Sequence, residues 1–64
     1  MQARVGELPV GTRFITSLTK RLGTVRAQLP GLGETQVHFD DGRDKLVSAF
    51  VMVKVVEQPR ETVN

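Results

Sequence analysis

Apolar and polar residues alternate in five short stretches of the chain, and glycine, proline or paired aspartates separate these stretches. Alternation with a period of two is typical of strands that bury one face. We therefore predict five β-strands, which cover residues 12–18, 22–29, 35–40, 43–47 and 51–56. No interval between the breaking residues is both long enough and periodic enough for a core helix.

The alternation also assigns the side chains of most predicted strands to two faces. The residues expected to face the core are Phe14, Thr16, Leu18, Val25, Ala27, Leu29, Val37, Phe39, Val51, Val53 and Val55. In the second strand, Thr24, Arg26 and Gln28 are assigned to the opposite face. The inward face of the fourth strand stays ambiguous.

The predicted turns suggest how the strands are connected. Asp40-Asp41-Gly42 is typical of a tight hairpin with glycine at positive φ, and Ser48-Ala49-Phe50 predicts a short irregular or 3-10 turn. Five such strands cannot bury themselves as one flat sheet, whereas a sheet that curls on itself hides one face. We therefore expect an all-β fold, a small five-stranded SH3-like barrel with a short 3-10 turn before the last strand.

The predicted domain organisation is simple. Residues 1–9 form an N-terminal segment that either pairs partly with the last strand or is loose, residues 10–56 form the barrel, and residues 57–64 form a flexible C-terminal tail. A chain of 64 residues has room for one small domain. It contains no cysteine, which excludes disulfides, zinc–thiolate sites and thiol catalysis.

Charge and hydropathy indicate which partners and which cellular location to expect. Nine Lys and Arg residues against seven Asp and Glu residues give a net charge of +2, which permits contact with nucleic acid or an acidic partner. No apolar run approaches the roughly 20 residues of a membrane span, and the N-terminus lacks the apolar core of a signal peptide. We expect a cytoplasmic protein that does not contact a membrane.

Four strings of residues resemble known small barrels: residues 11–14 (GTRF), 21–25 (RLGTV), 37–42 (VHFDDG) and 45–46 (KL). They resemble SH3-like barrels of the Tudor and KOW kind, and in particular the C-terminal Tudor-like module of UvrD/PcrA-type repair helicases. The resemblance covers about residues 10–56. It implies a docking module, which binds RNA polymerase in those helicases and nucleic acid or ribosomal partners in KOW proteins.

Those modules are appended to large enzymes, whereas this chain starts at Met1. We therefore expect a free-standing adaptor, such as a small protein of the phage or plasmid kind. Eukaryotic Tudor domains bind methylated side chains through a cage of several aromatic rings. This chain has three Phe and no Trp or Tyr, so methyl-lysine recognition is not expected.

Two surfaces are candidates for the docking function. Six basic residues form the candidate surface for nucleic acid or for a transcription or DNA-metabolism protein: Arg13, Lys20, Arg21, Arg26, Arg43 and Lys45. The alternative is an ordinary solvated surface, because Asp40, Asp41 and Asp44 offset the charge of Arg43.

The second candidate is an apolar interaction patch. Ile15, Met52 and Val56 fall on outward faces and would serve a protein-interaction adaptor or inhibitor, or a homodimer, if they cluster.

Catalytic and metal chemistry find little support in the sequence. His38 and Asp40 point the same way on one predicted strand, but nothing in the spacing connects Ser17 or Ser48 to His38. Residues 40–44 lack the order of a calcium loop, residues 31–33 precede no helix, and one histidine without cysteine makes no four-ligand site. We expect no metal and no cofactor.

One remote alternative is an oligomeric enzyme. The plasmid-encoded type II dihydrofolate reductases are also short SH3-like barrels, and they build one active site from four chains. Their V-Q-I-Y segment has no counterpart here, and the chain contains no Tyr. A non-enzymatic binding module therefore remains the leading expectation.

Overall fold

The computed structural model describes residues 2–58, and Met1 and residues 59–64 lie outside the description. The described elements are β1 (Gln2–Arg4), η1 (Val5–Glu7), β2 (Arg13–Thr16), β3 (Leu22–Leu29), η2 (Pro30–Leu32), β4 (Glu34–Phe39), β5 (Asp44–Ser48) and β6 (Met52–Glu57), where η denotes a 3-10 helix. These residues form strands and no α-helix, so the prediction of an all-β fold is confirmed. No helix in this part of the chain is long and apolar enough to cross a membrane.

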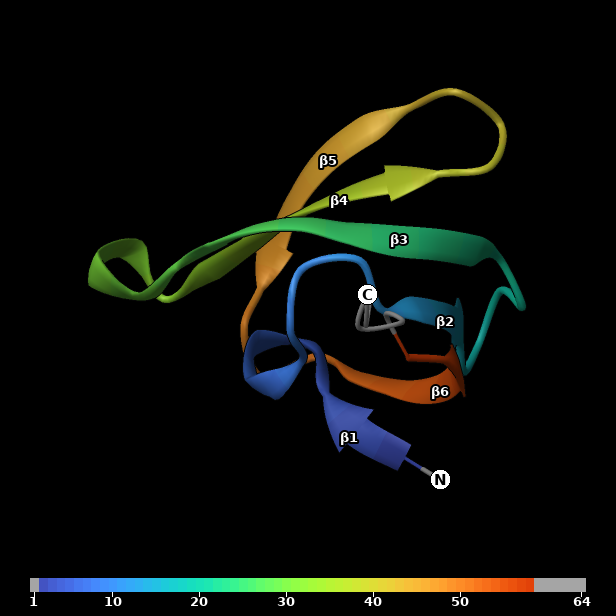
Figure 1. Ribbon diagram of the computed structural model, residues 1–64, viewed down its shortest axis with the longest axis horizontal. Coiled ribbons are helices and arrows are strands. Elements are labelled where there is room, and N and C mark those ends of the chain that lie inside the picture. The colour runs from blue at the N-terminus through green and yellow to red at the C-terminus, as the bar shows by residue number, and fades with distance from the viewer. Residues whose placement is uncertain (1, 59–64) are drawn as a thin grey trace, which may run out of the picture.

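The strands form one antiparallel sheet in the order β1-β6-β2-β3-β4-β5 (Figure 1). It has six strands where we predicted five, because Gln2–Arg4 pairs with β6. A segment of three residues is too short to show alternation, so we did not count it as a strand. Its partial pairing with the last strand was one of the two predicted alternatives, and this alternative is confirmed. Among the described residues the ladder is open, with β1 and β5 as its two edges.

Two phenylalanine rings occupy the centre of the core. The rings of Phe14 and Phe39 meet edge to face, with centroids 6.2 Å apart and an interplanar angle of 74°. Gly23 on β3 lies against both: a Cβ atom there would be 2.8 Å from Phe14 Cζ and 3.1 Å from Phe39 Cδ1. The other buried apolar side chains are Val5, Leu8, Val25, Val37 and Val53. Glycine at position 23 thus leaves the space in which the two rings meet.

A β-bulge interrupts β3. The register between β3 and β4 shifts between Val25 and Ala27, so Arg26 has no partner on β4. The extra residue reverses the alternation of side chains beyond it. Gln28, which we predicted on the outer face, therefore turns inward, and this assignment was wrong.

The inward Gln28 side chain holds the N-terminal segment in place, and we call its three hydrogen bonds the Gln28 clamp. Its Nε2 atom donates to the carbonyl oxygens of Val5 and Leu8 at 2.9 and 2.7 Å. Its Oε1 atom accepts a hydrogen bond from the buried Thr35 hydroxyl at 2.6 Å. The clamp therefore ties the segment after β1 to both β3 and β4.

Both predicted turns are present in the structure, although the second is not a 3-10 helix. Gly42 closes the β4–β5 hairpin at a φ of 95°, and its N–H donates to Phe39 O at 2.9 Å, as the Asp-Asp-Gly string predicts. The turn expected before the last strand is present at Ala49 and Phe50, where the Val51 N–H donates to Ser48 O at 3.1 Å, but it is not a 3-10 helix, since the described 3-10 helices are η1 and η2. Within the connection between β5 and β6, Ala49 also forms two hydrogen bonds to other parts of the chain. Its N–H donates to Gly33 O, and its carbonyl oxygen accepts the N–H of Gly6, both at 2.9 Å.

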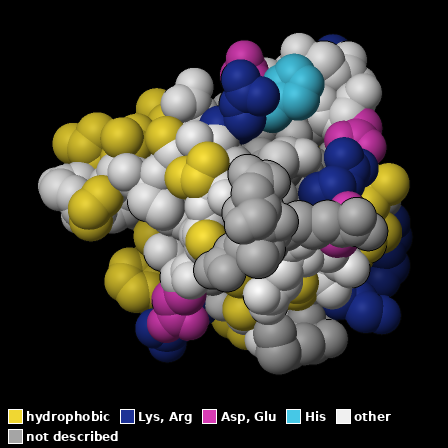
Figure 2. Space-filling model, viewed as in Figure 1, with side chains coloured by type: hydrophobic (Ala, Val, Ile, Leu, Met, Phe, Trp, Pro, Cys, Tyr) yellow, Lys and Arg dark blue, Asp and Glu magenta, His cyan; other side chains and the backbone are white. Residues whose placement is uncertain are grey.

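Several apolar side chains lie on the surface rather than in the core. Leu18, predicted to face inward, is 95% exposed because β2 ends at Thr16, and Val51 is 40% exposed because it precedes β6. Figure 2 shows further hydrophobic side chains gathered over the projecting end at the left, where Figure 1 places η2. Leu32, in η2, is 70% exposed.

Candidate binding surface at the first loop

The connection between β2 and β3, residues 17–21, is closed by its own hydrogen bonds, and we call it the first loop. Thr16 Oγ1 accepts the N–H of Arg21 at 2.9 Å and lies 2.7 Å from Thr19 Oγ1. The Lys20 N–H donates to Thr16 O at 3.1 Å, and Lys20 has a φ of 56° in the left-handed region. That conformation costs a non-glycine residue roughly 1–2 kcal/mol. The loop therefore holds Lys20 in a defined and strained backbone conformation.

A hollow of about 360 Å³ lies between the first loop and the β4–β5 hairpin. Its lining residues are Lys20, Arg21, Leu22, Phe39, Asp40 and Asp41. A backbone hydrogen bond of 3.0 Å from Asp40 N–H to Leu22 O joins its two sides. We call it the loop–hairpin hollow. Its walls combine apolar side chains with charges of both signs.

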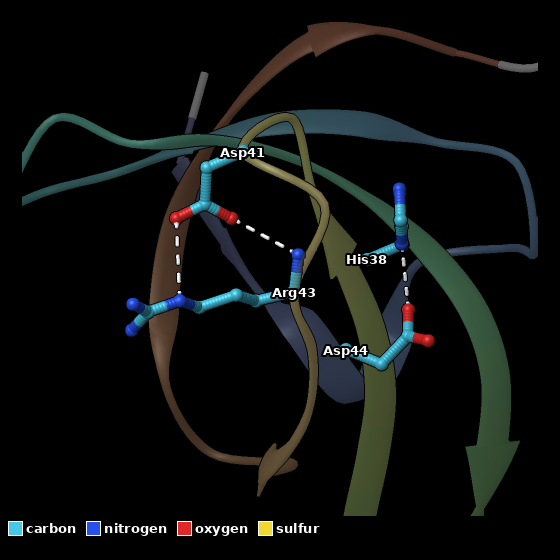
Figure 3. A network of polar contacts seen from close by, with 4 residues as sticks. All are labelled: His38, Asp41, Arg43 and Asp44. Carbon is cyan, nitrogen blue, oxygen red and sulfur yellow. Dashed lines mark hydrogen bonds and ion pairs between the residues drawn. The ribbon is translucent and has the colours of Figure 1, made fainter.

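The two carboxylates of the loop–hairpin hollow already have partners. Arg13, from β2, places Nη2 2.7 Å from Asp40 Oδ2. Asp41 accepts the backbone N–H of Arg43 at 3.0 Å, and its other oxygen lies 4.0 Å from Arg43 Nε (Figure 3). Both ion pairs are solvent-exposed, so each contributes little to stability. Their effect on the hollow is that its negative charges are largely offset.

The two cations of the loop–hairpin hollow, by contrast, make no ion pair within residues 2–58. Both Lys20 and Arg21 are exposed. The charge that the hollow can offer to a ligand is therefore positive. An ammonium and a guanidinium that line the same hollow are suited to an anion such as a phosphate.

No known protein family, curated protein or solved structure matches this chain. The function of the loop–hairpin hollow therefore has to be inferred from its own residues. Arg13, predicted as part of the same basic surface, lies beside the hollow but is engaged by Asp40. The register that brings residues 13 and 40 together depends on the pairing of β2, β3 and β4. The strand pattern alone did not indicate this neutralisation.

The remaining predicted basic residues lie elsewhere. Arg26 is the bulge residue of β3 and is exposed, roughly 13 Å along the strand from Leu22 at 3.3 Å per residue. Lys45 lies on the edge strand β5 opposite Val37, outside the hollow. Arg43 follows the hairpin and contacts Asp41. Of the six predicted residues, the hollow thus brings together only the two that lie in the first loop.

The histidine has a different partner from the one that we considered. His38 Nδ1 lies 2.6 Å from Asp44 Oδ1, opposite it on β5 (Figure 3). Asp40 instead accepts a hydrogen bond from Arg13. Neither Ser17 nor Ser48 is hydrogen-bonded to His38. Among residues 2–58 no three His, Asp or Glu side chains form a group that could hold a metal ion.

The predicted apolar patch is divided by a charge. Lys54 lies directly opposite Ile15, and Met52 and Val56 flank Lys54 on β6 with exposures of 46% and 54%. Lys54 therefore lies between the two apolar residues of β6, and Ile15 is paired with Lys54 rather than with either of them. An exposed apolar residue that the pattern missed is Leu18, since continued alternation had placed it in the core.

Proposed function

We propose that this protein is a non-enzymatic binding module that docks onto the phosphate backbone of nucleic acid. Lys20 and Arg21 are the residues that contact the phosphates. One observation carries the proposal: these two cations have no ion-pair partner within residues 2–58, while the carboxylates beside them are already engaged. A cytoplasmic role in transcription or DNA metabolism accords with the resemblance to Tudor and KOW modules.

The chemistry of the surface favours a duplex over a single strand. Single-strand binding without sequence preference uses aromatic rings on which bases stack. Phe14 and Phe39 are buried, and Phe50 is not part of the loop–hairpin hollow. With two phosphate contacts, the logarithm of the binding constant should fall with the logarithm of salt concentration with a slope of about −1.8. Binding of this kind is weak and independent of sequence.

The fold that we propose is an SH3-like barrel, formed by curling of the open sheet. Two hydrogen bonds support this closure: Val5 N–H donates to Val51 O at 2.8 Å, and Gly6 N–H donates to Ala49 O at 2.9 Å. They link the segment after edge strand β1 to the turn after edge strand β5. A Cβ atom at Gly6 would collide with the Cβ of Ala49, so this approach requires glycine. Nuclear Overhauser contacts between Val5 and Val51 in solution test it.

The binding proposal is tested by amide chemical-shift titration with a short DNA duplex, at low and at physiological salt. The wild type is compared with the double variant Lys20→Glu/Arg21→Glu. The matched control is Arg26→Glu/Lys45→Glu, which makes the same charge change at exposed positions outside the hollow.

We expect shifts at residues 20–22 and 39–41 that weaken with salt. The loop variant should bind at least tenfold more weakly, and the control should change affinity less than threefold. Equal losses in both variants would mean that net charge, not this hollow, attracts DNA. An absence of shifts at low salt would overturn the proposal, and a protein partner would then be the remaining candidate.

A further inference from the structure

A second hollow also uses the first loop as a wall, and its character is apolar. It has a volume of about 410 Å³ and is lined by Thr16, Ser17, Leu18, Thr19, Val51 and Met52. Leu18 is 95% exposed and Met52 is 46% exposed. We call it the Leu18 hollow. A large apolar side chain that is almost fully solvated contributes nothing to the core of this domain.

An aromatic side chain extends the apolar surface beyond the Leu18 hollow. Phe50, next in sequence to Val51, is 68% exposed. The Arg4 guanidinium carbon lies 5.4 Å from the centre of its ring, and Arg4 is also the β1 partner of Met52. A cation over the ring face is an attractive arrangement. Arg4 therefore contacts Phe50 and is the strand neighbour of Met52, which lines the hollow.

Single exposed apolar residues are common on protein surfaces, but a group of them around a hollow marks an interaction site. Aromatic, methionine and arginine side chains are enriched in protein interfaces, and they dominate this group. All four apolar members lie in two short segments, residues 18 and 50–52.

The charges around this surface indicate which partner fits it. Arg4 and Lys54 lie beside Met52, in the β1 partner position and two residues along β6. Within residues 2–58 neither cation forms an ion pair. Glu7 is the acidic residue nearest to Arg4 in the sequence, and the two do not form an ion pair. A second copy of this chain would bring like charges together across a symmetric interface. A partner that carries carboxylates would complement them.

We propose that the Leu18 hollow docks a peptide segment of a partner protein, in which a large apolar side chain is flanked by Asp or Glu. The apolar side chain occupies the hollow against Leu18 and Met52, and the carboxylates face Arg4 and Lys54. This surface is separate from the Lys20 and Arg21 side of the loop–hairpin hollow. The protein would then join an acidic protein segment to nucleic acid.

The test is a selection of random twelve-residue peptides displayed on phage against the immobilised full-length protein. Peptides are counter-selected on the variant Leu18→Ser/Met52→Ser. The matched control is Leu32→Ser/Leu46→Ser, which removes two other exposed apolar side chains, 70% and 55% solvated, outside the hollow. Enriched peptides are synthesised, and their affinity is measured by chemical-shift titration.

We expect enriched peptides that combine large apolar residues with an excess of Asp and Glu, and shifts centred on residues 16–19 and 50–52. Affinity should fall about tenfold or more in Leu18→Ser/Met52→Ser, as for the central residues of an interface, and severalfold in Arg4→Glu. The Leu32→Ser/Leu46→Ser control should retain it.

Three results would overturn the proposal: no enrichment over the counter-selection variant, peptides without acidic residues that ignore Arg4→Glu, or a dimer that Leu18→Ser/Met52→Ser dissolves. The dimer would show that a second copy occupies the hollow. The DNA titration of Leu18→Ser/Met52→Ser should match the wild type, so the two proposals fail separately.

Discussion

The Gln28 clamp offers a quantitative test of what holds this small domain together. In the variant Gln28→Leu, the Leu8 carbonyl and the Thr35 hydroxyl lose partners, whereas the Val5 carbonyl still accepts the N–H of Leu8 at 3.3 Å. Within residues 2–58, no other hydrogen bond to the Leu8 carbonyl or from the Thr35 hydroxyl is present. Both residues are buried, at 6% and 0% exposure.

An unsatisfied buried polar group costs about 1–3 kcal/mol. Two such groups would lower the free energy of unfolding by about 2–6 kcal/mol. Burial of the added leucine side chain offsets part of this cost, so we expect a net loss of about 2–4 kcal/mol in Gln28→Leu. A chain of this length has roughly 3–10 kcal/mol of stability in total, so the loss is a large fraction of it. At 4–8 °C per kcal/mol for a small domain, the melting temperature should fall by roughly 8–32 °C.

A second substitution separates this mechanism from a general disturbance of packing. Thr35→Val removes the stranded hydroxyl at nearly constant shape, so the double variant Gln28→Leu/Thr35→Val should be about 1–2 kcal/mol more stable than Gln28→Leu alone. Urea unfolding followed by far-UV circular dichroism measures all four proteins, because the chain has no Trp or Tyr for fluorescence. A double variant as unstable as the sum of the single variants would refute the reasoning.

Four further substitutions probe the core, η2, the first loop and the ion pair beside the loop–hairpin hollow. Gly23→Ala should lower the free energy of unfolding by about 1–3 kcal/mol, because the added methyl group overpacks the two core rings. In the control Gly31→Ala the added methyl group meets no atom within 4 Å, so its melting temperature should match that of the wild type. Thermal melts compare the two variants. Lys20→Gly relieves the left-handed backbone and should raise stability by up to about 1 kcal/mol, while the duplex titration weakens. Arg13→Gln should change stability by less than about 1 kcal/mol. It should nonetheless weaken DNA binding, because it frees the Asp40 carboxylate beside the hollow.

Local signals in the sequence were sufficient for much of the fold. Residues 22–29 were predicted as a strand with the bounds of β3, because an alternating stretch ends at Pro30. The hairpin turn at Gly42 followed from the Asp-Asp-Gly string. In each case a backbone preference and the hydrophobic pattern point to the same structure, which is the condition under which such predictions succeed.

The errors come from features that alternation does not contain. A strand pattern has a fixed period of two, so one unpaired residue at Arg26 was enough to reverse the assignment of Gln28. The ion pair between Arg13 and Asp40 joins residues 27 positions apart, and only the register of three strands brings them together. The candidate site depends on that pairing, because it decides which cations remain available. The two loop residues of the candidate site, Lys20 and Arg21, were predicted from the sequence. The sequence did not predict that the other four basic residues lie outside the hollow.

The first loop contains residues that are exposed or strained and therefore do not stabilise the fold. Its conformation is set by hydrogen bonds centred on Thr16, and the side chain of Leu18 lies almost wholly in solvent. Lys20 adopts a backbone conformation that a glycine would adopt at lower cost. A domain with so small a core would gain stability from a loop without these features. Residues that oppose the stability of the fold concentrate at functional sites. This loop, which forms a wall of both hollows, is therefore the part of the described chain best suited to carry function.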